Sequence, residues 1–167
     1  MSLRLHLHTI ELAFHWRWAP ILVLGTVLLG HSVMPWRYPA WQPELHWLTS
    51  VAVIVSGEAA LLLHELSHAL TARRSARIVF HGFVAETLLG DDANHDQAHV
   101  ALAGPLANIG LAALAAAARV VLGSEGALDT FLLVALVSNI AMAAISLIPV
   151  GGSDGARVLR ALALARS

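Results

Sequence analysis

Apolar residues gather in four long stretches, separated by shorter polar or proline-containing segments. The stretches cover about residues 18–34, 47–72, 100–122 and 130–150. Each is close to the roughly 20 residues that an α-helix needs to cross the hydrocarbon core of a bilayer. Lipid cannot hydrogen-bond to bare backbone groups, so segments of this kind span a membrane as helices. The pattern therefore predicts an all-α polytopic membrane protein with about four transmembrane helices.

The segments outside these stretches predict only small additional elements. Residues 3–12 begin with alternating apolar and polar positions, which favours a short N-terminal strand or interfacial ribbon. Residues 78–89 are compatible with a strand or hairpin against the membrane, and residues 156–165 with a short C-terminal helix. The first apolar stretch starts late and no small-residue cleavage site follows it, so we expect no cleavable signal peptide. We expect one membrane-embedded domain over residues 1–167.

Composition supports a lipid environment and excludes several classes of protein. Hydrophobic residues make up 57% of the chain and charged residues 13%, against roughly 25% charged in soluble domains. The absence of cysteine rules out disulfides and cysteinyl metal sites. A formal net charge of −1 argues against nucleic acid as a partner, because such proteins present a basic surface. The expected surroundings are therefore the lipid bilayer.

The distribution of arginine predicts the orientation in the membrane. With four spans, the N-terminus, the loop over residues 73–97 and the C-terminus lie on one side. That side holds Arg4, Arg17, Arg73, Arg74, Arg77, Arg157, Arg160 and Arg166, and the other holds Arg37 and Arg119. Short loops rich in arginine stay in the cytoplasm. We therefore expect a multi-pass protein of the cytoplasmic membrane with both termini in the cytoplasm.

The second apolar stretch carries the clearest chemical motif, His64-Glu65-Leu66-Ser67-His68. Residues four apart share one face of a helix, so both imidazoles can bind the same metal ion. Glu65 lies about 100° around the helix and can take a proton from water at that metal. The motif also arises by chance in a histidine-rich chain. Its place in an apolar helix favours a function, because polar groups there are costly.

A catalytic zinc ion needs a third protein ligand and an open position for water. The best candidate is Asp154, which follows Pro149 and a pair of glycines where the fourth stretch breaks. Irregular backbone at membrane depth is tolerated where it lines a cavity. The alternative is that Asp154 only caps the helix expected from Ala156, a common role of aspartate.

Three motifs in this order resemble those of the site-2 protease family of intramembrane zinc metalloproteases. They are His64-Glu65-x-x-His68, Ala103-Gly104-Pro105-Leu106-Ala107-Asn108, and Ser146-Leu147-Ile148-Pro149 followed by Asp154-Gly155-x-Arg157. The resemblance covers roughly residues 10–162. It implies one Zn²⁺ ion held by His64, His68 and Asp154, with Glu65 as the catalytic base. It also implies hydrolysis of peptide bonds in or beside transmembrane segments, with membrane proteins or remnant peptides as substrates.

The chain departs from the family pattern at three positions. Ser146 stands where the family usually has asparagine, a side chain thought to hold the substrate backbone or oxyanion. Gly152 replaces a proline and Ala156 a glycine. Serine can still donate one hydrogen bond, with a shorter reach than an amide. A catalytically weak or inactive relative that binds client transmembrane helices is therefore an alternative, as is a metal transporter with Glu58 and the two histidines along its path.

Four further polar residues are candidates for positioning the substrate: Ser146, Asn108, Asn139 and Glu58. Glu58 shares a helical face with Glu65, about 10 Å deeper in the membrane. It is either functional or a structural group bonded to one of the two asparagines. Asn108 lies within a rhythm of small residues that favours close helix contact, so it can also serve between helices. Four spans leave little protein between the expected active site and the surrounding lipid, so we expect self-association or a partner subunit.

Overall fold

The structure is a computed structural model of the chain, and it describes residues 3–7, 9–73, 75–89, 98–123 and 125–165. Its helices are α1 (Trp18–Leu28), the π-helical η1 (Leu29–Val33), α2 (Met34–Arg37), α3 (Pro43–Ala72), α4 (Ala98–Leu122), α5 (Gly126–Ser146) and α6 (Asp154–Leu164). Its strands are β1 (Leu3–Leu7), β2 (Ile10–Phe14), β3 (Ala76–Phe80) and β4 (Ala85–Leu89).

Four helical stretches of the described chain are long and apolar enough to cross a membrane. They are Trp18–Arg37, Pro43–Ala72, Ala98–Leu122 and Gly126–Ser146. The expected fold class, a polytopic helical membrane protein with a small N-terminal strand element, is thereby confirmed. Many of the large apolar side chains on these helices are exposed, such as Val23, Leu114 and Val137. In a bilayer these side chains face lipid, and their exposure needs no other explanation.

The first span runs past residue 34, the expected end of the first apolar stretch, and continues through Pro35 to Arg37. A proline inside an α-helix removes a hydrogen bond and its ring meets the carbonyl four residues earlier. Here the π-helical segment Leu29–Val33 ends two residues before the proline. Insertions of this kind are a recognised cause of irregularity within helices. The wider turn lets the helix pass the proline without ending.

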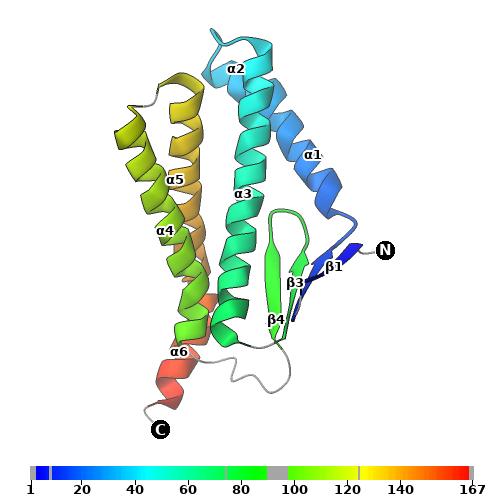
Figure 1. Ribbon diagram of the computed structural model, residues 1–167, viewed down its shortest axis with the longest axis vertical. Helices are drawn as coiled ribbons and strands as arrows, with labels where there is room; N and C mark the ends of the chain where they lie inside the picture. Colours follow the sequence, from blue (N-terminus) through cyan, green and yellow to red (C-terminus); the bar gives the residue numbers. More distant parts are fainter. Residues whose placement is uncertain (1–2, 8, 74, 90–97, 124, 166–167) are drawn as a thin grey trace.

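A four-stranded sheet lies beside the lower half of α3, in the order β1-β2-β3-β4. The two outer pairs are antiparallel hairpins, and β2 pairs with β3 in parallel. The strand expected within residues 3–12 is therefore a hairpin, and the hairpin expected within residues 78–89 is confirmed. In Figure 1 the hairpin of β3 and β4 rises between α3 and α1. Its turn contacts α1, because Gly82 lies against Ile21.

One face of the sheet packs on α3 and forms the described hydrophobic core. Leu12, Ile78 and Phe80 of the sheet meet Leu61 of α3 there, and all four are buried. Leu12 pairs with Ile78, and Ile78 pairs with Thr87, so one row of side chains crosses the sheet toward the helix. The consequence is that β4 lies against α3 with a threonine on its packed face.

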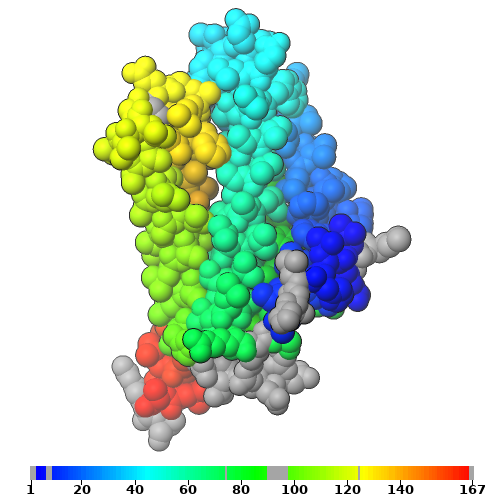
Figure 2. All heavy atoms as spheres, viewed as in Figure 1, coloured from blue at the N-terminus to red at the C-terminus, as the bar shows by residue number. Residues whose placement is uncertain are grey.

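Helices α3, α4 and α5 pack against one another as a three-helix bundle (Figure 1). A short turn joins α4 to α5, and across it Arg119 donates two hydrogen bonds to Asp129, at 2.8 and 3.0 Å. Figure 2 shows α4 and α5 on one side of α3, and α1 on the opposite side of α3. After α5 the chain turns and α6 packs under α4, which brings the start of α6 to the lower part of α3.

Candidate metal centre

The two histidines of α3 lie on one buried face of the helix. His64 is 5% exposed and His68 is 2% exposed, and their ring centroids are 4.9 Å apart. The Nδ1 atom of His68 donates to the carbonyl oxygen of Val100 on α4, at 2.7 Å. Because that carbonyl can only accept, Nδ1 carries a proton, and Nε2 is the ring nitrogen that would bind a metal ion. Metal-binding histidines are oriented by hydrogen bonds of this kind.

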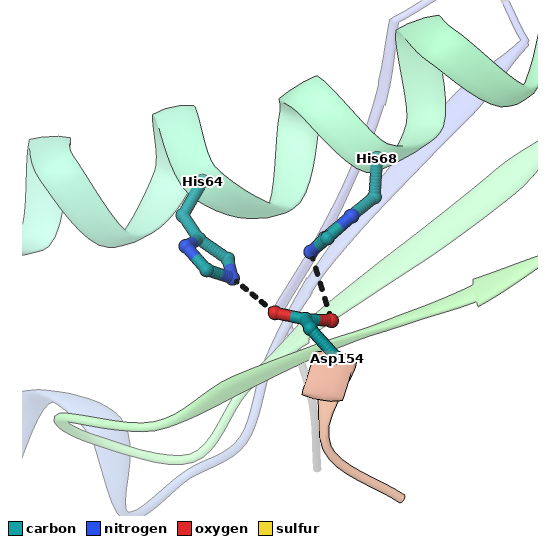
Figure 3. Close-up of side chains that lie close together, drawn as sticks. All are labelled: His64, His68 and Asp154. Atoms are coloured by element: carbon teal, nitrogen blue, oxygen red, sulfur yellow. Dashed lines mark hydrogen bonds and ion pairs between the residues drawn. The ribbon is translucent and has the colours of Figure 1, made fainter. Parts of the chain in front are cut away.

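Asp154, the first residue of α6, faces both histidines (Figure 3). Its Oδ2 lies 3.1 Å from Nε2 of His64, and its Oδ1 lies 3.3 Å from Nε2 of His68. Donor atoms of the three residues all lie within 4.8 Å of one another, close enough to hold one metal ion. Two imidazoles and a carboxylate form the donor set of many catalytic zinc sites, which leave a fourth position open. The residues present therefore fit such an ion.

Electrostatics keep the carboxylate in its ligating form. Burial opposes ionisation of Asp154, yet hydrogen bonds and charge from His64 and His68 hold its pKa well below the usual range. The carboxylate is therefore ionised at neutral pH. Metal binding requires a deprotonated carboxylate and neutral imidazoles, so the group can take up an ion without first losing a proton from Asp154.

The turn between α5 and α6 aims Asp154 at the histidines. Ser153 caps α6, and its hydroxyl accepts from the backbone N–H of Ala156 at 3.2 Å. The same hydroxyl donates to the carbonyl of Ile148 at 2.6 Å, which closes the turn. The alternative in which Asp154 caps this helix is thus wrong, because Ser153 fills that position. The Asp154 side chain is left to point inward.

Two glycines allow the backbones to approach at this site. A Cβ on Gly104 of α4 would overlap Nε2 of both His64 and His68. A Cβ on Gly155 would overlap the backbone carbonyl of Leu147 at the end of α5. Any larger residue would push α4 away from the histidines, or α6 away from α5. Both glycines belong to motifs singled out from the sequence.

Glu65 lies next to the histidines and is held by a residue that sequence reasoning missed. Thr87 of β4 donates its hydroxyl to Oε2 of Glu65, at 2.8 Å, and lies 3.1 Å from the backbone oxygen of the same residue. Both residues are buried. One signal was available, because alternation along β4 puts Thr87 on the same face as Ala85 and Leu89. A single hydroxyl on a buried, otherwise apolar face of a strand predicts a hydrogen-bond partner on the element that packs against it.

Glu58 bonds to neither asparagine proposed as its partner. It accepts a hydrogen bond from the indole N–H of Trp18 on α1, at 2.8 Å. The alternative in which Glu58 bonds to Asn108 or Asn139 is therefore wrong. Seven residues separate Glu58 from Glu65, so both face the same side of α3, where α1 and the sheet pack.

The remaining candidates do not belong to the metal-binding group of His64, His68 and Asp154. Asn108 is fully buried one turn beyond Gly104, and neither atom of its amide has a hydrogen-bond partner among the described residues. Asn139 donates to the carbonyl of Ala135 on its own helix, at 2.8 Å. Ser146 likewise donates to Ala143, at 3.1 Å. Their role in positioning a substrate stays a prediction.

The fold and the buried group together define a class: a helical membrane protein with a candidate metal centre at the meeting of α3, α4 and α6. No family model matches the chain. The chain is 30% identical over 156 residues to the "Putative zinc metalloprotease Rip3" of Mycobacterium tuberculosis, in strains Erdman and H37Rv. The match covers 88% of this chain and 39% of each relative, so this chain spans about two fifths of their length.

A solved structure shares the fold. The structure resembles the site-2 protease from Methanocaldococcus jannaschii, with a TM-score of 0.63 and 18% sequence identity. The match covers 97% of this chain and 71% of that one. Together with the sequence match, it confirms the resemblance to the site-2 protease family that the three motifs predicted.

Proposed function

We propose that this chain is an intramembrane zinc metalloprotease that hydrolyses peptide bonds in or next to transmembrane segments of membrane proteins. One observation carries the proposal: donor atoms of His64 and His68 on α3 and of Asp154 on α6 all lie within 4.8 Å of one another. A group of this kind among apolar helices is costly unless it has a function. Glu65 adjoins it, and mere metal binding would not need a carboxylate in that place.

The proposed reaction assigns a step to each residue. The ion would be held by the two Nε2 atoms and the Asp154 carboxylate. Zinc, when bound, would lower the pKa of its water toward neutrality and polarise the scissile carbonyl. Glu65 would accept the proton of the attacking water and deliver it to the leaving nitrogen, as a general base and then a general acid.

The substrate must expose its backbone before this reaction can occur. A transmembrane helix hides its peptide groups in internal hydrogen bonds. We therefore expect local unwinding, and faster cutting of substrates with glycine or proline near the bond. Single-pass membrane proteins and remnant peptides fit this requirement. The arginine distribution further suggests the cytoplasmic membrane as the location, with both termini in the cytoplasm, and a homo-oligomer or partner subunit remains a prediction.

The decisive experiment compares wild type with Glu65→Gln in proteoliposomes. The probe is a fluorescent single-span peptide with a Gly-Pro pair near the end of its apolar segment. Cleavage should fall by about 100-fold or more, since proton transfer contributes roughly 10²–10⁴-fold. Zinc content, measured by mass spectrometry, should stay near one ion per chain. Equal cleavage by both proteins would contradict the proposal.

A second variant tests the ligand set. Asp154→Ala should lower both zinc content and cleavage, because two imidazoles alone bind zinc weakly. Unchanged occupancy would remove Asp154 from the ligands.

The same preparation tests the alternatives. The hydroxyl of Ser146 donates to a carbonyl of its own helix and not toward a substrate. This favours the alternative of a non-proteolytic relative that only binds client helices. Such a protein would bind the peptide without cutting it, and Glu65→Gln would change nothing. A transporter would instead move zinc across the liposome membrane.

A further inference from the structure

The hydroxyl of Thr87 lies within hydrogen-bond distance of two oxygen atoms, and both belong to Glu65. It lies 2.8 Å from Oε2 of the carboxylate and 3.1 Å from the backbone oxygen. A threonine hydroxyl has one proton to donate. Because both acceptors belong to Glu65, rotation of the hydroxyl leaves that residue held. The contact is closed off from bulk water, since Thr87 is 5% exposed and Glu65 is 7% exposed.

The position of Thr87 is fixed by the sheet and not by a flexible loop. Thr87 pairs with Ile78 of β3, and Ile78 is fully buried and pairs with Leu12 of β2. Strands of a sheet therefore hold the hydroxyl against α3. Groups placed on regular elements are held more accurately than groups placed on loops.

The contact fixes one half of a carboxylate whose direction matters for chemistry. A glutamate has three rotatable bonds, and its carboxylate can turn toward or away from the histidines. With Oε2 bound to Thr87, the other oxygen, Oε1, is the one left to meet water at the metal centre. We propose that Thr87 is a positioning residue, which sets the direction of the Glu65 carboxylate from outside the helix that carries the motif. This inference rests on the proposed function, because only an enzyme needs the base to be aimed.

The test is a pair of substitutions at one position. Thr87→Val keeps the shape and suits a strand but removes the hydroxyl, and Thr87→Ser keeps the hydroxyl but removes the methyl group. We expect Thr87→Val to lower kcat by about ten- to a hundredfold, the cost of a misplaced catalytic group. KM, zinc content and the thermal midpoint should stay near their wild-type values. Thr87→Ser should recover most of the lost kcat.

A matched control comes from the same helix as Glu65. Thr49 of α3 is also buried, at 4% exposed, and lies 16 residues or about 24 Å along the helix from Glu65. Thr49→Val makes the same chemical change away from the site and should leave kcat and zinc content unaltered.

The outcomes separate the two proposals. Wild-type activity in Thr87→Val would overturn the role of Thr87, and so would a Thr87→Ser variant as slow as Thr87→Val, since packing would then be the cause. Loss of zinc from Thr87→Val would also overturn it, because the residue would then support the ligands. Failure of the proposed function itself appears elsewhere in the assay: wild type would cut the peptide no faster than Glu65→Gln, and both proposals would fall.

Discussion

His68 and Asp154 of the candidate metal centre each have a neighbour that limits the direction in which the side chain can point. Val100 takes the Nδ1 proton of His68, and Ser153 occupies the capping position that Asp154 could have filled. Neither neighbour carries a charge or any reactive chemistry. Their effect is to remove alternatives that would turn the donors away from one another, a form of preorganisation.

Gly104 allows a sharp test of this packing. Its substitution by alanine would put a methyl group onto Nε2 of both histidines, so either the rings or α4 must move. We expect Gly104→Ala to lower zinc content well below one ion per chain and to lower cleavage in proportion. Gly110→Ala is the matched control on the same helix, because nothing lies within 4 Å of the added methyl group. Equal zinc content in the two variants would contradict the close approach.

Residues of the site differ in how far the sequence reveals them. His64 and His68 follow from helical periodicity alone, since a spacing of four places them on one face. Asp154 was a candidate from its place after a broken helix and from the family resemblance. Thr87 and Trp18 could not be derived in this way. Their partners lie 22 and 40 residues away along the chain, and these contacts exist only once the sheet and α1 pack against α3.

At the scale of elements, the sheet and α1 together form the side of the molecule that faces the motif helix. A strand or hairpin within residues 78–89 could be predicted from the sequence, but the parallel pairing of β3 with β2 could not. β2 and β3 are separated by the whole of the first two spans, and no local pattern encodes a pairing over that distance. The sheet matters because it delivers a hydroxyl to Glu65 from a rigid support.

The hydrogen bond between Trp18 and Glu58 fastens α1 to α3 at the start of the first span. Trp18→Phe removes the indole N–H and leaves the carboxyl without this partner. An unsatisfied, partly buried group of this kind costs about 1–3 kcal/mol. We expect the free energy of unfolding to fall by that amount, measured by titrating purified protein in mixed micelles with dodecyl sulfate. Zinc content should not change, because the contact lies outside the metal-binding group.

Trp36→Phe supplies the control for that measurement. Trp36 is 81% exposed, so the same replacement there should change stability by no more than about 0.5 kcal/mol. A Trp18→Phe protein as stable as Trp36→Phe would show that the hydrogen bond does not hold the two helices together.

At the scale of the whole molecule, four apolar stretches sufficed to predict the fold class, because lipid allows few solutions for a spanning backbone. The limits of the helices were less accurate. The fourth was expected over residues 130–150 and is found at Gly126–Ser146. Its lower end is set by the turn that delivers Asp154, and hydrophobicity alone does not report such a turn. Apolar residues such as Ile148 and Val150 belong to that turn and not to the helix.

The direction of insertion is the property of the whole molecule that can be tested most directly. Even numbers of spans place both ends on one side, and eight of the ten arginines lie there. Because the chain has no cysteine, single cysteines can be introduced without a background. Ser75 and Ala165 belong to the arginine-rich side, and Ala40 and Glu125 to the other, and all four are exposed.

We expect a membrane-impermeant maleimide to label cysteine at residues 40 and 125 in intact cells. Cysteine at residues 75 and 165 should react only after the membrane is opened, because the positive-inside rule keeps that side in the cytoplasm. The converse labelling would invert the proposed topology. It would also put the candidate metal centre, which lies toward the end of the bundle that carries α6, on the outer side of the membrane (Figure 1). The site would then reach the unwound part of a substrate helix from outside the cell. This measurement therefore decides whether the site acts on the cytoplasmic or the outer end of a transmembrane helix.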